Sequence, residues 1–501
     1  MMRVFESVRA AAVVLFLLAT LNRAVLVLTN QFDGLYGQDA YAYFFYAREF
    51  FANVTRLQSP PPFWWPLGYP ALLSVGFLLG GVNAAAAQAI TVLSSALVPV
   101  FAFLLTHEAA NKYKIFAAWV AGLICIASGQ LAQSSVVIMA DAPALMFATL
   151  GAWLLLRYAR TRNALTLCAA AFAVGMAAWA RWQNLIFAAV WVVTLLMIEF
   201  RAAPKTISRL DARTPRMLLA IGIIALVLLP QLLIRATTNA PLAGQTWLEN
   251  WSIGNFFART FDNADGHFEY ALPVAIFNAQ VLAHPAYLFV MLTPLFGIGI
   301  FVLRKRTTSL LVLGWILGMY FFLAGIPYEN FRFPLGLFAP VAVVTGMGAA
   351  WVWAKLSASR LRFVFVGWIG AALCVMLFWQ PRVLAPVLEI KLRELQHTRW
   401  LETQLLPNAL VYTMSIDGAI EMYSRIRVEN LWDMDPAALD AATPTYLYAD
   451  TNNIDSQWRG RLPDQLIRSL TATNELHPIA SFNGWTLFRV RNCKYRVLDC
   501  E

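Results

Sequence analysis

The sequence is poor in charged residues. Only 13% of its 501 residues are charged and 59% are hydrophobic, whereas a typical soluble domain has roughly 25% charged residues. This shortage excludes an ordinary soluble protein and is typical of a chain that lies mostly in a membrane. The hydrophobic residues concentrate in residues 9–380 and become sparser afterwards. We therefore expect a membrane-embedded domain over residues 1–380 and a smaller domain over residues 381–501.

Cysteine and histidine are also scarce, and their spacing does not predict a metal site. The five cysteines include no pair at metal-ligand spacing. Four of the five histidines also stand far apart in the sequence, at His107, His267, His284 and His397. The sequence therefore indicates neither a metal nor another cofactor. Cys493 and Cys500 lie close together in the polar tail, and they could form a disulfide in an oxidising compartment.

Internal repeats and low-complexity tracts are absent from the sequence. Inverted repeats and broken helices are typical of secondary transporters, whereas the apolar runs here look continuous. This favours an enzyme, with a polytopic transporter or lipid flippase as the alternative interpretation. The net charge of +10 does not indicate nucleic-acid binding, because the cations gather in short loops between apolar runs.

What the sequence does contain is a series of apolar runs long enough to cross a bilayer. They lie at 9–29, 85–107, 115–132, 142–157, 163–180, 184–200, 217–235, 285–303, 309–326, 333–354 and 363–379. A helix of about 20 apolar residues covers the ~30 Å hydrocarbon core. We therefore expect about eleven spanning helices. The first run resembles a signal sequence without a clear cleavage site, so we interpret it as an uncleaved membrane helix.

Clusters of Lys and Arg between these runs predict the orientation of the chain. The clusters are Lys112/Lys114, Arg157–Arg162, Arg201–Arg216, Arg304–Arg306 and Lys355–Arg362. Such clusters stay on the cytoplasmic side, and all five can do so only if the shorter apolar run 67–83 does not cross. We therefore expect 67–83 to form a juxtamembrane helix within a first outer loop, 30–84. A second long outer loop, 236–284, and the C-terminal domain then also lie outside the cytoplasm.

By this topology, several ionisable residues gather at the outer ends of the helices. They are Asp39, Asp141, Arg181, Arg235, Glu329 and Arg332. Arginine donates paired hydrogen bonds to phosphate oxygens, and a carboxylate can accept the proton of an attacking hydroxyl. The combination predicts transfer of a sugar from a lipid phosphate. A single base in that role inverts the anomeric configuration, because no covalent sugar–enzyme intermediate is needed.

Each of these residues also has a simpler interpretation. Asp39 could be a loop acid or a helix cap, and Asp141, which precedes Ala-Pro-Ala, could be an N-cap. Arg181 and Arg332 could extend to lipid head groups. Arg23, midway along the first run, could face the helix bundle or pair with an internal acid. The aromatic residues within 41–46 could form an interfacial belt or a platform for a sugar ring.

Five motifs occur in an order that is specific when they are taken together. They are QDAYAYFFYAREF (38–50), SPPPFWWPLGYPALL (59–73), MADAPALM (139–146), AAWARWQN (177–184) and FRFPLGLFAP (331–340). With them the chain resembles the GT-C glycosyltransferases, in particular the protein O-mannosyltransferases, aminoarabinose transferases and rhizobial lipopolysaccharide-core transferases. These enzymes use polyprenyl-phosphate-linked sugars and act on lipids, glycans or proteins.

The polar tail has a helix-like stretch at 388–406 and strand-like stretches at 409–415, 445–450 and 485–490, which predict a small extracytoplasmic α/β domain. The lack of an organelle-specific signal favours a bacterial inner membrane.

The resemblance implies a GT-C fold over most of residues 9–380. It implies Asp39 as the general base and Asp141 as a second catalytic residue. Implied substrate-binding residues are Tyr43, Arg48, Glu49, Arg181, Glu329 and Arg332. The sequence departs from the family at Ala40, where many relatives have Glu, and at Trp64–Pro66, where some have a Lys near the donor phosphate.

Overall fold

The computed structural model of the chain describes residues 7–201, 214–237, 250–263, 265–303, 306–356, 358–407, 409–436, 444–473 and 475–490. The chain forms two compact units. The first comprises Met1–Gly34, Tyr43–Phe257 and Leu272–Ala385, and the second comprises Leu35–Ala42, Ala258–Ala271 and Pro386–Glu501. Cys493 and Cys500, most of the cluster Arg201–Arg216, and part of the loop 236–284 lie outside the described residues.

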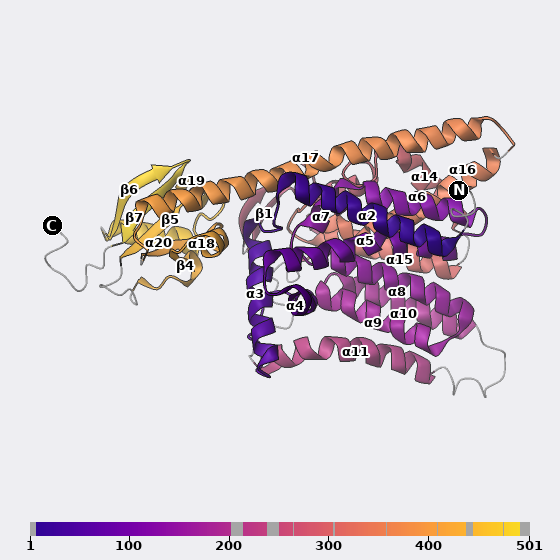
Figure 1. The fold of residues 1–501 in the computed structure, drawn as a ribbon, viewed down its shortest axis with the longest axis horizontal. Coiled ribbons are helices and arrows are strands. Elements are labelled where there is room, and N and C mark those ends of the chain that lie inside the picture. Colours follow the sequence, from indigo (N-terminus) through magenta and orange to yellow (C-terminus); the bar gives the residue numbers. More distant parts are fainter. Residues whose placement is uncertain are drawn as a thin grey trace. The chain divides into compact units, whose positions relative to one another are not determined.

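The first unit is built from helices (Figure 1). Its longer helices are α2 (Val8–Asn30), α5 (Ala84–Ala109), α6 (Lys114–Ala127), α8 (Asp141–Thr161), α9 (Ala164–Ala180), α10 (Asn184–Arg201), α11 (Thr214–Thr237), α14 (Thr293–Val302), α15 (Arg306–Gly325) and α16 (Phe338–Leu356). Shorter elements are α4 (Gly68–Gly80), α7 (Gly129–Val136), η2 (Ile253–Phe257), α13 (Val274–Ala279), η3 (Gln280–Leu282), η4 (Val290–Leu292) and η5 (Phe333–Leu337). Two further helices, α3 (Gly37–Thr55) and α17 (Leu361–Gln404), continue into the second unit.

Every apolar run that predicts a spanning helix contains a helix in the structure. Within the described residues, seven helices are long and apolar enough to cross a membrane, and the bent pair α6–α7 makes an eighth. The remaining three runs form shorter apolar helices, Ala164–Ala180, Asn184–Phe200 and Val290–Val302. The predicted polytopic helical membrane fold is therefore confirmed, with seven or eight full-length spans plus shorter helices rather than eleven of equal length.

The run 67–83 forms only the 13-residue helix α4. At 1.5 Å per residue it is about 20 Å long, which is too short for a ~30 Å hydrocarbon core. Its length agrees with the sequence-based expectation that this run does not cross. Its position at the outer membrane surface stays a prediction.

The run 115–132 was expected to be one continuous helix, and this expectation is wrong. The chain bends by 58° between α6 and α7. At the break, Ser128 is extended and its hydroxyl accepts the N–H of Leu131, capping α7. The carbonyl of Ile126, near the end of α6, accepts the fully buried Arg23 (3.0 Å) and Gln380 (2.9 Å). Arg23 thus faces the bundle, where it satisfies a helix end.

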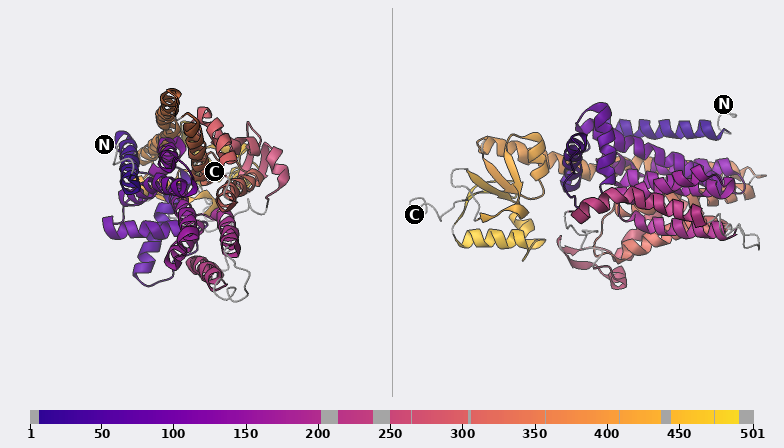
Figure 2. Two further views of the ribbon diagram at one scale, coloured as in Figure 1. Left: turned by 90° about the vertical axis from the view of Figure 1, so that its right-hand side faces the viewer. Right: turned by 90° about the horizontal axis from the view of Figure 1, so that it is seen from below.

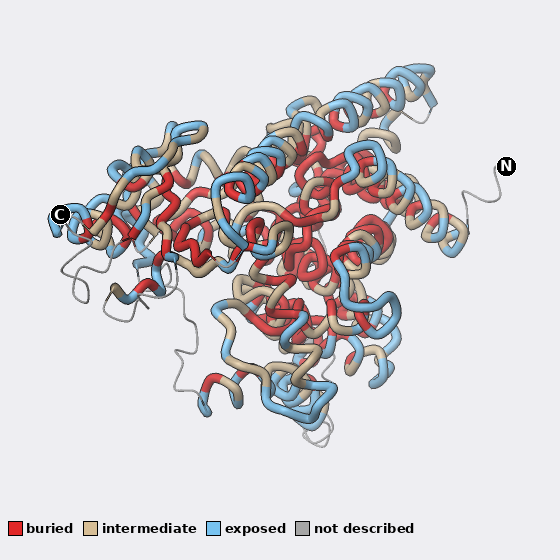
Figure 3. The backbone as a smooth tube through the Cα atoms, turned by 60° about the vertical axis from the view of Figure 1, so that its left-hand side comes forward, coloured by how far each residue is buried: buried red, intermediate tan, exposed pale blue. Residues whose placement is uncertain are grey.

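Helix α16 is buried from Phe338 to Ala350, and Figure 3 shows that the buried residues of the helical part gather in its interior. Small residues let α16 approach its neighbours closely. A Cβ added to Gly348 would lie 1.9 Å from the carbonyl oxygen of Leu295 on α14, and one added to Gly346 would lie 2.4 Å from that of Ala117 on α6. These glycines therefore fix the distance between the central helices.

The second unit contains a five-stranded sheet in the order β4-β3-β5-β7-β6. The strands are β3 (Leu410–Thr413), β4 (Arg427–Asn430), β5 (Thr445–Ala449), β6 (Leu476–Phe482) and β7 (Trp485–Val490). β3 runs parallel to β4 and β5, whereas β7 is antiparallel to β5 and β6. The sequence predicted strands at 409–415, 445–450 and 485–490, and the small α/β domain is confirmed.

Helices cover both faces of this sheet (Figure 2). On one face, Leu401 of α17 packs on Val411 and Leu487, together with α18 (Asp417–Tyr423). On the other face, Leu470 of α20 (Leu462–Ala472) packs with Leu410 and Leu447, near α19 (Thr451–Ser456). A short hairpin, β1 (Thr260–Asn263) with β2 (Gly266–Glu269), also belongs to this unit.

Helix α17 does not end where the apolar run ends. The sequence predicted a span at 363–379 and a separate polar helix in the C-terminal domain. The structure instead has one uninterrupted helix of 44 residues. Its later turns carry alternating charged and apolar residues, which pack against the sheet of the second unit.

Candidate functional site

The first unit brings together two predicted site residues as a buried ion pair. Asp141 lies in the first turn of α8, and Arg181 follows the last residue of α9. Nη1 of Arg181 pairs with Oδ1 of Asp141, and their side chains are 16% and 3% exposed. The N-cap of α8 is Ala140, with no side-chain cap. The structure therefore favours neither an N-cap role for Asp141 nor a lipid-directed Arg181.

Arg332 joins this pair through an aromatic ring. The Cζ atoms of Arg181 and Arg332 lie 5.1 Å and 5.8 Å from the ring centroid of Phe333. A guanidinium within about 6 Å of a ring is attracted by its electron-rich face. Nη1 of Arg332 also contacts Sδ of Met139, two residues before Asp141. Segments around residues 140, 181 and 332 thus converge on one basic cluster, which we call the arginine cluster (Asp141, Arg181, Arg332 and Phe333).

Two buried tyrosines that the sequence analysis missed lie near this cluster. Tyr69 and Tyr287 are fully buried, and both interact electrostatically with Asp141. The hydroxyl of Tyr69 hydrogen-bonds the hydroxyl of Thr91 (2.7 Å), and that of Tyr287 donates to the carbonyl of Phe331. In the sequence, the one sign that Tyr69 could belong to the site was its position beside a proline inside an apolar run.

Tyr43 connects α3 to this region by ring packing. It is buried, stacks on Trp65 (4.9 Å between centroids) and meets Tyr69 edge to face (5.1 Å). Tyr46 likewise stacks on Phe63 at 4.0 Å. The face of α3 that carries Tyr43 and Tyr46 therefore packs against residues 59–66, which we call the Pro-rich segment. This face is neither an open sugar platform nor a lipid-facing belt.

The Pro-rich segment is also held by two polar contacts. The hydroxyl of Tyr46 donates to the carbonyl of Pro61 (2.6 Å). The buried guanidinium of Arg235, near the end of α11, donates to the carbonyls of Phe63 and Trp64, both at 2.9 Å. These bonds give the segment a defined path between α3 and α4.

Arg48 and Glu49 do not share the face of α3 that carries Tyr43. Both are exposed, and Cζ of Arg48 lies 5.1 Å from the ring of Phe45. The described contacts do not bring them to the arginine cluster.

Glu329 is buried in the segment between α15 and η5, three residues before Arg332. Its Oε1 has no hydrogen-bond partner among the described residues. Burial raises the pKa of this carboxyl from 4.5 to about 7. Glu329 therefore holds a proton over much of the weakly acidic range.

We expect this raised pKa to make stability depend on pH. The folded state retains the Glu329 proton up to about pH 7, whereas the unfolded state releases it near pH 4.5. Stability therefore falls as the pH rises through this window. Glu329→Gln should remove that fall, so that its melting temperature exceeds that of the wild type at pH 8 and matches it at pH 4.5. Thermal unfolding in detergent across this range tests the expectation, and parallel profiles for the two proteins would contradict it.

Asp39 belongs to the second unit, in the first turn of α3. It is half-buried, and the helix N-terminus favours its negative charge. The carboxylate of Glu394 on α17 holds this turn, because Oε1 accepts the N–H of Gly37 (2.8 Å) and Oε2 accepts the hydroxyl of Tyr41 (3.2 Å). Gly37 has a φ of +58°, which suits glycine.

Lys391 completes this anchor one turn before Glu394. Its ammonium donates to the hydroxyls of Tyr41 (3.4 Å) and Tyr423. Lys391 and Glu394 are both buried. The sequence analysis missed these residues, because two charges in a polar helix give no sign of burial. Within the part of the chain that the structure describes, no three His, Cys, Asp or Glu side chains gather to hold a metal ion.

Known proteins share this architecture. ArnT from Cupriavidus metallidurans, bound to undecaprenyl phosphate, matches with a TM-score of 0.64 and 14% identity over 95% of this chain and 97% of its own. The archaeal oligosaccharyltransferase AglB from Archaeoglobus fulgidus, in complex with an inhibitory peptide and a dolichol-phosphate, matches with a TM-score of 0.53 and 12% identity over 97% of this chain and 75% of its own. At these identities the likeness concerns the fold.

Sequence comparison adds a family match. No curated protein sequence matches this chain. Residues 47–240 match the family model of the dolichyl-phosphate-mannose-protein mannosyltransferases, PMT. This segment includes Asp141 and Arg181 but not Asp39 or Arg332. With an ArnT-like fold along nearly its whole length, the chain is a polytopic helical membrane protein with a GT-C fold, and its segment from α3 to α11 is similar to the PMT family.

Proposed function

We propose that the protein transfers a sugar from a polyprenyl-phosphate donor to a hydroxyl-bearing lipid, glycan or protein acceptor, with inversion at the anomeric carbon. The observation that carries this proposal is the arginine cluster, where two half-buried guanidiniums converge with one buried carboxylate. The undecaprenyl phosphate and dolichol-phosphate bound by the two structural relatives support the same donor class.

Charge balance at the arginine cluster suits such a donor. Arg181 and Arg332 contribute two positive charges and Asp141 one negative charge, which leaves one net positive charge when Glu329 is protonated. The phosphodiester of a polyprenyl-phosphate sugar carries one negative charge. When the bond between the sugar and the phosphate breaks, the leaving phosphate gains a second charge, which the guanidiniums stabilise. Their pairing geometry also orients the phosphate for displacement.

Asp39 serves as the general base in this proposal. Its carboxylate accepts the proton of the acceptor hydroxyl while that oxygen attacks the anomeric carbon. A carbon–oxygen bond to the acceptor forms, the bond to the donor phosphate breaks, and the phosphate leaves with the bonding electron pair. Asp141, the second catalytic carboxylate, orients Arg181 through their ion pair. Tyr43, whose ring packs edge to face against that of Tyr69, stays assigned to substrate binding.

The exposed pair Arg48 and Glu49 remains assigned to substrate binding, for parts of the substrates that extend into solvent. We place Asp39, the arginine cluster and the C-terminal domain on the non-cytoplasmic side of a bacterial inner membrane, from the alternation of basic clusters.

The purified protein in liposomes tests the proposed function. Undecaprenyl-phosphate sugars with different labelled sugars are incorporated together with extracted cell-envelope lipids and glycans. We expect free undecaprenyl phosphate to appear in step with labelled acceptor for at least one donor. Movement of an intact donor across the bilayer without cleavage would instead support the flippase interpretation.

A further inference from the structure

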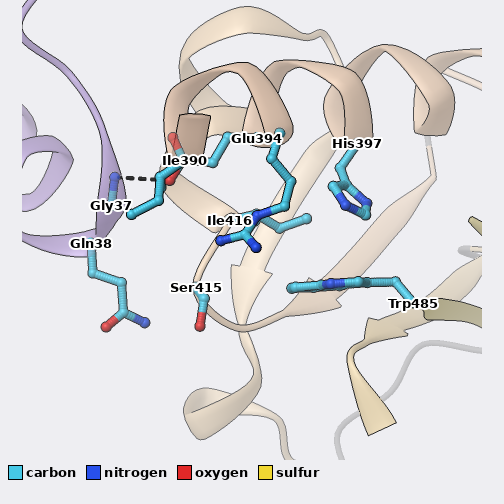
Figure 4. Close-up of a pocket in the computed structure, with 9 residues that line it drawn as sticks. Gly37, Gln38, Ile390, Glu394, His397, Ser415, Ile416 and Trp485 are labelled. Carbon is cyan, nitrogen blue, oxygen red and sulfur yellow. Dashed lines mark hydrogen bonds between the residues drawn. The ribbon is translucent and has the colours of Figure 1, made fainter. Parts of the chain in front are cut away.

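The second unit contains a cavity that the roles assigned above do not use (Figure 4). Its volume is about 260 Å³, and it is lined by Gly37, Gln38, Ile390, Arg393, Glu394, His397, Ser415, Ile416 and Trp485. These residues come from the first turn of α3, one face of α17, the β3–α18 connection and the start of β7. All of them belong to the same compact unit. The cavity is small, so it suits one ring-sized group rather than a large ligand.

A buried histidine in this cavity has an unused nitrogen. His397 is 1% exposed, and its Nδ1 is hydrogen-bonded to the hydroxyl of Tyr448. Its Nε2 has no hydrogen-bond partner among the described residues. Leaving a buried polar atom without a partner costs about 1–3 kcal/mol. Figure 4 shows the ring of His397 facing the same space as the indole of Trp485. A ligand hydroxyl in the cavity would satisfy this nitrogen.

Two further side chains complete the recognition chemistry. The half-buried indole of Trp485 lies with its centroid 5.2 Å from that of His397 and offers an aromatic surface to the cavity. Arg393 is exposed and forms no ion pair or hydrogen bond with the described residues. An aromatic surface binds the apolar face of a ring, and a guanidinium binds a phosphate or carboxylate. The three groups together fit a sugar ring that carries an anionic substituent.

We propose that this cavity binds the acceptor through a sugar ring with an anionic group. The inference rests on the proposed function, in which Asp39 is the base. Gly37 and Gln38, which line the cavity, are the two residues immediately before Asp39. Glu394 also lines the cavity and accepts the N–H of Gly37. It therefore holds the first turn of α3, which carries Asp39, at the cavity wall. An acceptor ring held here lies next to the turn that carries the proton acceptor.

Glucose 1-phosphate is a suitable probe, with glucose and inorganic phosphate as its separated parts. Saturation-transfer difference NMR on the full-length protein in nanodiscs reports binding of the two sugars, and inorganic phosphate, which has no non-exchanging protons, is added as a competitor of glucose 1-phosphate. We expect transfer to the ring protons of glucose 1-phosphate, and weaker transfer to glucose. Arg393→Gln and Trp485→Ala should each weaken binding of glucose 1-phosphate about tenfold or more, the size expected for losing a charge-assisted hydrogen bond or a buried ring contact.

Arg399→Gln is the matched control, because Arg399 is exposed on the same helix but does not line the cavity. It should bind like the wild type. If Trp485→Ala does not fold, Trp485→Phe, which keeps an aromatic surface, should retain binding while Arg393→Gln still loses it. The proposal is overturned if the wild type binds no glucose 1-phosphate, or if Arg393→Gln binds it as the wild type does. This readout needs no donor or turnover, so it stands apart from a failure of Asp39 as the base.

Discussion

Replacing Asp39 by asparagine is expected to lower the rate of sugar transfer by about 10²–10⁴-fold, the range for loss of a general base. Asparagine has the same shape but cannot accept the acceptor proton. The fold should persist, because a charge at a helix N-terminus contributes only about 0.3–1 kcal/mol, and Glu394 still holds the turn through Gly37 and Tyr41. Initial transfer rates in liposomes and the melting temperature of the variant in detergent check both expectations.

Asp455→Asn provides the control for charge removal within the same unit. Asp455 is 64% exposed and lies 3.4 Å from Arg468, and exposed pairs of this kind contribute about 0–1 kcal/mol. Its transfer rate should equal that of the wild type. A wild-type rate for Asp39→Asn would show that another group takes the proton, and the role that the GT-C resemblance gives to Asp39 would be lost.

The helical membrane fold could be predicted because its signals are local. A run of about 20 apolar residues has one stable solution in a bilayer, a helix that satisfies its own backbone. The break at Ser128 could not be predicted in this way. It depends on Arg23 and Gln380, which supply donors to the carbonyl of Ile126 from segments more than 100 residues away in the chain. The bend is therefore a tertiary feature that an apolar run does not reveal.

Part of the candidate site was predictable for a different reason. Asp141, Arg181 and Arg332 are ionisable residues at the ends of apolar runs, where burial of charge is costly and indicates function. The tyrosines near them, Tyr69 and Tyr287, lie inside apolar stretches, and only the proline beside Tyr69 distinguishes it from an ordinary packing residue. Their proximity to Asp141 depends on how α4 and the segment before α14 fold back.

Helical geometry alone could have separated Arg48 and Glu49 from Tyr43. At 100° per residue, positions five and six apart on a helix differ by about 140° and 120° in direction. The two charged residues are accordingly exposed while Tyr43 is buried. The motif placed them together because they are close in sequence, whereas the helix turns them to different sides.

The second large effect is expected at Arg181. Arg181→Gln should weaken binding of undecaprenyl phosphate about 10–150-fold, since a hydrogen bond to a charged group contributes about 1.5–3 kcal/mol. It should also destabilise the fold, because Asp141 would be left buried without its partner, which costs about 3–5 kcal/mol. The double variant Arg181→Gln/Asp141→Asn should recover part of that stability but none of the affinity. Lipid binding and thermal unfolding of the two single variants and the double variant check this cycle.

Arg162→Gln separates the loss of an ion pair from the loss of a phosphate contact. Arg162 pairs with the buried Glu199 at 2.7 Å, away from the arginine cluster. This variant should be less stable than the wild type yet bind undecaprenyl phosphate equally well. If Arg181→Gln behaves in the same way, the Asp141–Arg181 pair only stabilises the bundle and the donor phosphate binds elsewhere. If the affinity for undecaprenyl phosphate instead falls in Arg181→Gln and in the double variant but not in Arg162→Gln, the guanidinium of Arg181 itself holds the phosphate. The loss of stability and the loss of affinity then have separate causes.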